Sequence, residues 1–316
     1  MATQFDPDSV AVVGAGTMGH GIATVFASEG YDVGLHDQDE GRLETAHDRV
    51  HESLTQLDDH DRLGVELETA RNAVSSGTDL EAVIADADLV IEAVTEELDV
   101  KRTVFETLSD LTDSGTVLAT NTSGLSITEI AAATDAPDRV LGTHWFNPPH
   151  IVPLVEVVKG EETDDDLAAA MTAFLDDIGK TAITVEKDVP GFIGNRIQMA
   201  MCYEAFSLLD RGIASAEDID KAVKAGFGFR LPSMGIFEKV DQSGVDVHHA
   251  IESYLMPELD RGTDPNPVVS DLVEQGDFGL KTGEGVYDWT DADPDAVVTD
   301  RDAQLLAQLE QYESDH

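Results

Sequence analysis

A glycine motif near the start of the chain constrains the fold most. Gly14-Ala15-Gly16-Thr17-Met18-Gly19 reads G-x-G-x-x-G, between the apolar run Val10–Val13 and a helical pattern from about Met18 to Ser28. In a strand–turn–helix unit the first glycine allows the tight turn, the second admits a pyrophosphate, and the third permits close packing. The free N–H groups at the helix start favour phosphate. The motif alone is weak, but this context predicts that residues 14–19 hold a dinucleotide.

An acidic residue indicates which dinucleotide is bound. Asp37 lies at the end of the predicted second strand, 18 residues beyond Gly19, where such folds contact the adenosine ribose. A carboxylate there accepts hydrogen bonds from the ribose and repels a 2′-phosphate. Its neighbours are His36 and Gln38, so no arginine stands beside it. The sequence therefore predicts NAD rather than NADP as the cofactor.

The first part of the chain alternates between strand and helix signals. Short apolar runs predict buried strands at residues 10–13, 33–35, 89–93, 117–119, 140–142 and 154–158. Helical patterns lie between them, at residues 18–28, 42–57, 62–73 and 100–111, and the second and third of these suggest a helical hairpin. Such alternation predicts right-handed crossovers and a doubly wound, mostly parallel α/β sheet of the Rossmann type.

The character of the chain changes after Lys187. Strand signals nearly vanish, and helices are predicted at residues 192–209, 216–225, 247–259 and 268–275. Proline and glycine in Asp188-Val189-Pro190-Gly191 punctuate the boundary. We therefore expect an NAD-binding domain with a hairpin insertion over residues 1–187, and an all-helical substrate and dimerisation domain over residues 188–316. The strongly apolar first helix should be buried within that domain and between subunits.

The charge balance is far from ordinary. Lys and Arg total 19 against 64 Asp and Glu, a formal net charge of −45. The acid recurs along predicted turns and helix faces, so it is a surface trait. It repels nucleic acid and anionic membranes, which we exclude as partners. Salt shortens the screening length from about 10 Å at 0.1 M to about 3 Å at 1 M, so we predict a halophilic source, with an ordinary acidic protein as the alternative.

The sequence also predicts where the protein works. Cys202 is the single cysteine, so an internal disulfide is excluded. The segment Met1–Ser9 lacks the apolar core of a signal peptide, and no run approaches the roughly 18 apolar residues of a membrane span. We expect a cytoplasmic protein, and no cluster of residues suggests a metal site.

Further motifs follow one another along nearly the whole chain. They are Val90–Val94, Asn121-Thr122-Ser123, His144-Trp145-Phe146-Asn147-Pro148, Glu156, Pro190–Arg196 and Lys281–Gly285. In this order they resemble the L-3-hydroxyacyl-CoA dehydrogenase family, and several ordered motifs are far more specific than one glycine turn. The resemblance implies NAD-dependent oxidation of a short (3S)-3-hydroxyacyl-CoA, such as 3-hydroxybutyryl-CoA, in fatty acid β-oxidation. It also implies a homodimer joined through the helical domain.

Two residues provide the chemistry that such a reaction requires. Oxidising an alcohol needs a base with neutral-range titration to remove the hydroxyl proton as hydride leaves carbon. His144 follows a predicted strand near the carboxyl edge of the sheet, where ligands bind in such folds. Glu156 lies on the next predicted strand, where it would hold one imidazole tautomer and stabilise the protonated ring. The resemblance assigns the same roles.

The resemblance also assigns the remaining site residues. Ser123 and Asn147 would bind the substrate hydroxyl or carbonyl, and Asn195 would reach the same pocket. Glu92 and Lys101 would lie at the nicotinamide side of the cofactor, and Ser123 and Lys281 would also contact the cofactor. Simple alternatives remain for these residues, which are a helix cap for Asn195 and a surface ion pair for Glu92 and Lys101.

The chain departs from the family at the CoA site. Ser53 matches a CoA-binding serine, as does Ser123, but the second CoA residue of the hairpin, a lysine, is His60 here, within Asp58-Asp59-His60-Asp61. Residues 230–238 also depart from the usual pattern near the acyl chain. Two alternatives therefore stay open. One is a dehydrogenase of a non-CoA alcohol, such as carnitine, a sugar acid or a pyridine derivative. The other is a non-catalytic, crystallin-like NAD-binding protein.

Overall fold

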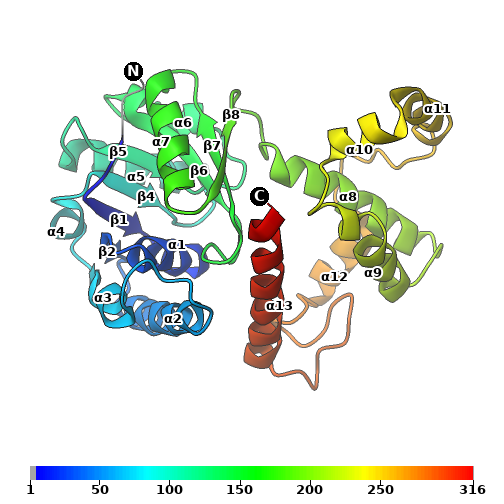
Figure 1. Cartoon of the computed structure of the whole chain (residues 1–316), viewed down its shortest axis with the longest axis horizontal. Coiled ribbons are helices and arrows are strands. Elements are labelled where there is room, and N and C mark those ends of the chain that lie inside the picture. The colour runs from blue at the N-terminus through cyan, green and yellow to red at the C-terminus, as the bar shows by residue number, and fades with distance from the viewer. Residues whose placement is uncertain (1–4, 316) are drawn as a thin grey trace. The chain divides into compact units, whose positions relative to one another are not determined.

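The chain forms two compact units. The computed structural model describes residues 5–315, so the first four residues of the predicted N-terminal domain, and of the segment searched for a signal peptide, lie outside it, as does His316. One unit extends to Arg196 and the other begins at Ile197 (Figure 1). The predicted boundary between residues 187 and 188 falls a little earlier in the chain.

The described part of the first unit contains one eight-stranded sheet. Its strands are β1 Ser9–Val13, β2 Asp32–His36, β3 Val74–Gly77, β4 Leu89–Glu92, β5 Val117–Thr120, β6 Val140–Trp145, β7 Leu154–Lys159 and β8 Thr181–Val185. The spatial order is β3-β2-β1-β4-β5-β6-β7-β8, with β6 and β7 antiparallel and the other neighbouring pairs parallel. The strand order reverses between β1 and β4, where such sheets bind ligands at their carboxyl ends. This confirms the predicted fold class.

Helices cover both faces of the sheet. They are α1 Thr17–Ser28, α2 Glu40–Asp59, α3 Leu67–Asn72, α4 Leu80–Ile84, α5 Leu98–Leu111, α6 Ile127–Ala131, the 3-10 turn η1 Pro137–Arg139 and α7 Asp165–Asp177. Val10 and Val12 of β1 belong to the apolar cluster that includes side chains of α1, α2 and α7. Ala11 and Val13 belong to a second cluster with α4, α5 and α6. Side chains of successive strand residues thus pack on opposite faces of a sheet that is buried on both sides.

Several elements were not predicted from the sequence, namely β3, α4, α6, α7 and β8. In β3, Val74 is the one buried residue, so this edge strand lacks the apolar run that marks a central strand. The helix expected over residues 62–73 forms only from Leu67, as α3. Gly64 lies in the loop before this helix and donates its N–H to the Ser28 carbonyl over 2.9 Å.

The second unit is helical. Its helices are α8 Gly194–Asp210 (which starts in the first unit), α9 Ala216–Ala225, the 3-10 turn η2 Gly228–Arg230, α10 Ile236–Ser243, α11 Val245–Leu255, α12 Pro267–Gln275 and α13 Pro294–Asp315. Between residues 197 and 315 the β structure is limited to isolated bridges around Glu284. The all-helical prediction is confirmed, although α10 and α13 were not predicted. No helix of the described chain is long and apolar enough to cross a membrane.

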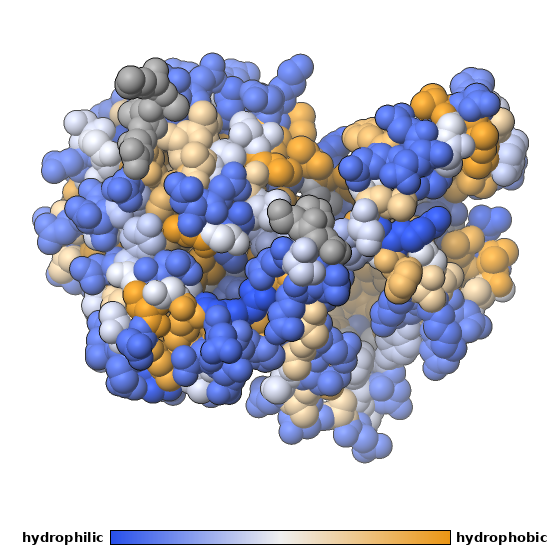
Figure 2. Space-filling view, in the orientation of Figure 1, coloured by the Kyte–Doolittle hydropathy of each residue, from blue (hydrophilic) through white to orange (hydrophobic). Residues whose placement is uncertain are grey.

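The surface reflects the composition. Figure 2 shows hydrophilic side chains over most of the visible face, with apolar patches around α10 and α11. Phe229, Phe237 and Tyr254 of the second unit are 78%, 85% and 67% exposed. Large aromatic side chains are rarely this exposed on a protein surface, so these three residues mark a candidate area for contact with another molecule.

Candidate active site

The glycine turn leaves room for a dinucleotide. Gly14 adopts a left-handed backbone with φ of 109°, and a Cβ there would lie 2.6 Å from the Ala93 carbonyl oxygen. A Cβ on Gly16 would meet nothing within 4 Å, so this side of the turn is open. Gly16 is also the N-cap of α1 and forms no side-chain cap, which leaves the first amides of the helix, at Thr17 and Met18, suited to a phosphate. The turn fits the predicted cofactor.

Asp37 lies against this turn. Its Oδ2 accepts a hydrogen bond from the Ala15 N–H over 3.0 Å, and its Oδ1 accepts one from Asp39 over 3.1 Å. A backbone hydrogen bond also links the glycine turn to the end of β2, because the Gly14 N–H donates to the His36 carbonyl over 2.7 Å. The carboxylate is therefore held beside the turn, as a ribose contact requires, and retains free lone pairs.

His144 and Glu156 face each other across the antiparallel pair β6–β7. The His144 Nδ1 lies 2.6 Å from the Glu156 Oε2, and both side chains are almost fully buried. An ionised carboxylate only accepts hydrogen bonds, so Nδ1 carries a proton, and in the neutral form of the ring Nε2 is the acceptor. His144 was expected after a strand, and it is the penultimate residue of β6.

Glu156 stays ionised although it is buried. Burial alone raises the pKa of this carboxyl, but three hydrogen bonds outweigh it and hold the pKa below its ordinary value. They come from His144 and from the backbone N–H groups of Gly194 and Ile193, which donate to Oε1 over 2.9 and 3.0 Å. The site therefore holds a fixed negative charge that would stabilise a protonated imidazole.

The other side of the imidazole faces Asn195. Its Nδ2 lies 3.5 Å from the His144 Nε2 and donates to the Ser123 carbonyl over 2.8 Å. The structure thus brings together four of the five predicted catalytic residues, His144, Glu156, Asn195 and Ser123. The fifth, Asn147, lies exposed in the loop that follows β6.

Glu92 and Lys101 form a fully buried ion pair. The Lys101 Nζ lies 2.8 Å from the Glu92 Oε1, and both side chains are 0% exposed. The Glu92 oxygens also accept from the Val94 N–H over 2.7 Å and from the Thr120 hydroxyl over 2.7 Å. The alternative of an exposed surface pair is therefore excluded, and the Glu92 carboxylate accepts its hydrogen bonds from groups of the protein itself.

Glu96 extends this network toward Ser123 and was not singled out from the sequence. Its Oε2 lies 3.5 Å from the Lys101 Nζ. Its Oε1 accepts from the Ser123 N–H and from the Thr122 hydroxyl, each over 2.7 Å. Glu96 is one of two neighbouring acids in Thr95-Glu96-Glu97, and only its position opposite the turn after β5 distinguishes it.

The remaining two predicted site residues are Ser53, in the first unit, and Lys281, in the second. Ser53 is half-buried on α2, and the acidic segment Asp58–Asp61 spans the end of that helix at Asp59. Lys281 belongs to the second unit. The predicted CoA contact of Ser53 and the predicted cofactor contact of Lys281 both stay predictions.

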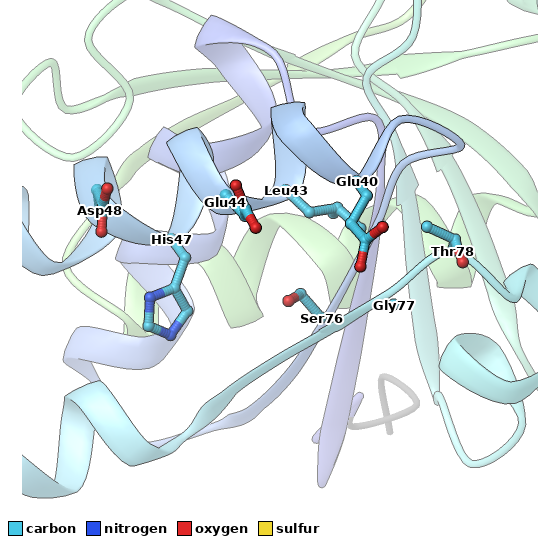
Figure 3. Close-up of a pocket in the computed structure, with 8 residues that line it drawn as sticks. All are labelled: Glu40, Leu43, Glu44, His47, Asp48, Ser76, Gly77 and Thr78. Carbon is cyan, nitrogen blue, oxygen red and sulfur yellow. The ribbon is translucent and has the colours of Figure 1, made fainter.

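A hollow of about 600 Å³ lies elsewhere in the first unit, between α2 and the edge strand β3 (Figure 3). Its lining contains none of the predicted site residues and consists of Glu40, Leu43, Glu44, His47, Asp48, Ser76, Gly77 and Thr78. Three of these are carboxylates, which suits neither CoA nor NAD phosphates. Among the described residues, no group of His, Cys, Asp and Glu could hold a metal ion.

A dinucleotide turn and a buried histidine–glutamate pair in one α/β unit define a dehydrogenase. Comparison with known families gives the family. The NAD-binding domain of 3-hydroxyacyl-CoA dehydrogenase matches residues 9–189, and the C-terminal domain of the same enzyme matches residues 191–289. The chain belongs to the 3-hydroxyacyl-CoA dehydrogenase family of NAD-dependent enzymes. The family and the cofactor expected from the sequence are confirmed.

Individual relatives act on different substrates. The mitochondrial hydroxyacyl-coenzyme A dehydrogenase of Sus scrofa is 39% identical over 88% of this chain and 90% of its own. The 5-formyl-3-hydroxy-2-methylpyridine 4-carboxylate 5-dehydrogenase of Mesorhizobium japonicum is 35% identical over 95% of this chain and 96% of its own.

Solved structures show the same division. A crystal structure of such a pyridine dehydrogenase matches with a TM-score of 0.91 at 33% identity, over 98% of this chain and 99% of that chain. The (S)-3-hydroxybutyryl-CoA dehydrogenase of Ralstonia eutropha matches with a TM-score of 0.73 at 35% identity, over 90% and 99%. The family is thus established, while its members differ in whether the substrate carries CoA.

Proposed function

We propose that this chain oxidises a short (3S)-3-hydroxyacyl-CoA, such as 3-hydroxybutyryl-CoA, to the 3-oxoacyl-CoA. The observation that carries the proposal is the 2.6 Å hydrogen bond between His144 Nδ1 and Glu156, which in the neutral ring makes Nε2 the atom that accepts the hydroxyl proton. Bound NAD supplies the hydride acceptor for the carbinol carbon. Glu156 orients the ring and stabilises its protonated form, as a carboxylate does in catalytic triads.

The cofactor would be held by the turn and the residues around it. The proposed contacts are Gly14, Ala15, Gly16, Thr17, Met18, Gly19, Asp37, Glu92, Lys101, Ser123 and Lys281. Backbone donors matter here because cationic side chains are scarce in a chain of net charge −45. Glu92 would act indirectly, since its carboxylate bonds Lys101, which in turn approaches Glu96.

The substrate hydroxyl would lie between His144, Ser123, Asn147 and Asn195. The Asn195 amide supports this placement, because it is near the His144 Nε2 and is tied to the Ser123 carbonyl. Ser53 and Ser123 would contact the CoA moiety. The acidic segment Asp58–Asp61 beyond Ser53 repels CoA phosphates, and concentrated salt would weaken that repulsion.

A second candidate is the oxidation of a pyridine derivative without CoA. It is favoured by the match to the pyridine dehydrogenase structure over 98% of this chain. That coverage includes most of α13, which lies beyond residue 289, where the match to the family's C-terminal domain ends. The acidic segment Asp58–Asp61 also favours a substrate without CoA, because it repels CoA phosphates.

A substrate panel decides between these candidates. NADH absorbance would be followed with acetoacetyl-CoA in the reductive direction, and with (3S)-3-hydroxybutyryl-CoA, free 3-hydroxybutyrate, carnitine and hydroxymethylpyridine carboxylates in the oxidative direction, at several KCl concentrations. We expect the highest kcat/KM with the CoA thioesters. Faster turnover of a CoA-free alcohol would favour the second candidate. No turnover of any alcohol by protein that binds NAD would support the crystallin-like alternative.

We further propose a cytoplasmic homodimer joined through the second unit. The exposed Phe229, Phe237 and Tyr254 support this, because a second copy would remove their apolar area from water. Light scattering should give twice the chain mass of 33.9 kDa. Phe237→Glu should shift the protein toward the monomer, whereas a monomeric wild type would contradict the proposal.

A further inference from the structure

The segment that enters α8 has an unusual backbone. Gly191 has φ of 77° and Phe192 has φ of 49°, so two consecutive residues are left-handed. Glycine adopts this conformation freely, but a residue with a bulky side chain is an outlier there. The surrounding structure must therefore hold Phe192 in place, and such strain concentrates at functional sites.

The ring of Phe192 provides the restraint. It is 1% exposed and clusters with Ile127, Val158 and Val185. Its centroid lies 5.7 Å from that of the His144 ring, at an angle of 57°. The Phe146 ring also contacts the imidazole, with centroids 4.5 Å apart. The His144 ring is thus packed against two aromatic side chains.

The residues that follow Phe192 contact the catalytic pair one after another. The N–H groups of Ile193 and Gly194 donate to the Glu156 Oε1. The side chain of Asn195 then reaches both the His144 Nε2 and the Ser123 carbonyl. The backbone conformation of Phe192 therefore determines whether the three residues that follow it can make these contacts with Glu156, His144 and Ser123.

We propose that Phe192 is a positioning residue for His144 and Glu156. Its buried ring fixes the left-handed turn, the turn aims two amides at Glu156, and the ring itself limits the rotation of the imidazole. The inference rests on the catalytic roles proposed above for this pair. It concerns a residue that touches neither reacting atom.

Two substitutions test the proposal. Phe192→Leu retains an apolar anchor but removes the ring from His144, and Phe192→Ala removes both. Phe174→Leu is the matched control, because Phe174 is also buried, at 4% exposure, but stacks on Phe26 within the core. For each variant, kcat and KM would be measured for (3S)-3-hydroxybutyryl-CoA and NAD. The imidazole ¹⁵N resonances of the ligand-free protein, assigned with His144→Gln, report the tautomer directly.

We expect Phe192→Leu to lower kcat roughly 3- to 10-fold and Phe192→Ala roughly 10²-fold, with little change in KM, as for misplaced catalytic groups. The His144 ¹⁵N resonances should move away from the Nδ1–H tautomer in both variants and stay unchanged in Phe174→Leu. If Phe192→Ala fails to fold, Phe192→Leu decides alone. The proposal is wrong if Phe192→Leu matches the control in both kcat and ¹⁵N resonances. The resonances test it even if another substrate proves correct, whereas a fully active His144→Gln would refute the proposed function.

Discussion

Asp37 accepts a hydrogen bond from the backbone N–H of Ala15, which joins the end of β2 to the glycine turn that follows β1. The bond spans two neighbouring parallel strands whose register places Val13 opposite His36. The glycine turn therefore fixes Asp37, the residue proposed to select the cofactor. A change at Asp37 should alter cofactor preference without moving the substrate site.

Asp37→Ser combined with Gln38→Arg should weaken NAD use and admit NADP, because the change removes the repulsion of a 2′-phosphate and adds a cation. The ratio of kcat/KM for the two cofactors is the measurement. Asp39→Ser is the control, since it removes a nearby charge while retaining a hydroxyl that can cap α2, where Asp39 is the N-cap. An unchanged ratio in the double variant would mean that Asp37 is not at the ribose.

His144→Gln should lower kcat roughly 10²-fold or more, the typical loss of a general base. Glu156→Gln should lower it too, and the double variant should lose little beyond the worse single variant, since residues that act as one unit are not additive. Losses that multiply while NAD affinity is retained would rule out the paired mechanism.

Glu156 should also make stability depend on pH. Its pKa in the fold lies below the ordinary value of about 4.3, mainly because hydrogen bonds from His144, Gly194 and Ile193 outweigh burial. Its contribution is therefore present above that value and is lost as pH falls through the lower pKa of the fold. Urea unfolding should show Glu156→Gln about 1–3 kcal/mol less stable at pH 7, with a smaller difference near pH 3.

Glu186→Gln is the control for that experiment. Glu186 pairs with Lys159 over 2.8 Å but is 71% exposed, and such pairs contribute only about 0–1 kcal/mol. A pH-independent difference between wild type and Glu156→Gln would show that the carboxylate charge is not what stabilises the fold.

Lys101→Met should be strongly destabilising, because it leaves the fully buried Glu92 without its cation. Breaking a buried ion pair at one partner costs about 3–5 kcal/mol. Replacing both residues, as Lys101→Met with Glu92→Met, should recover part of that loss, which thermal unfolding would measure. Equal instability of the single and double variants would mean that the charge pairing is not responsible.

Removing salt should unfold or inactivate the protein, since its charge of −45 is then unscreened. The melting temperature should rise with KCl between about 0.1 and 3 M, a range in which the screening length falls to a few ångström. A flat curve would contradict the prediction of a halophilic source.

The sequence predicted the parts of the fold that carry strong periodic signals. The central strands β1, β4 and β5 are apolar runs buried on both faces, and the glycine turn is a local motif, so each could be found without the rest of the structure. Strand β3 and helices α4 and α6 are short and expose polar residues, so their local signal is weak. Strand β3 forms because the sheet offers it an edge to pair with, and α4 and α6 form because the sheet offers them a face to pack on.

The site divides in the same way. His144 and Glu156 were predicted as a pair from two separate motifs. The role of Glu96 could not be found, because it depends on the turn after β5 that brings the Ser123 N–H within reach. The positive φ of Phe192 likewise could not be predicted from the sequence Pro190-Gly191-Phe192.

The antiparallel pairing of β6 and β7 ties the contact between His144 and Glu156 to strand register. Side chains alternate between the two faces of a sheet, so a slip of one residue would send His144 and Glu156 to opposite sides. The loop between Trp145 and Leu154 could gain or lose residues without this effect, provided that the paired positions are retained. A single insertion within either strand would separate His144 from Glu156, even in a protein that still folds. With the catalytic roles proposed for this pair, turnover would then report a shift in strand alignment.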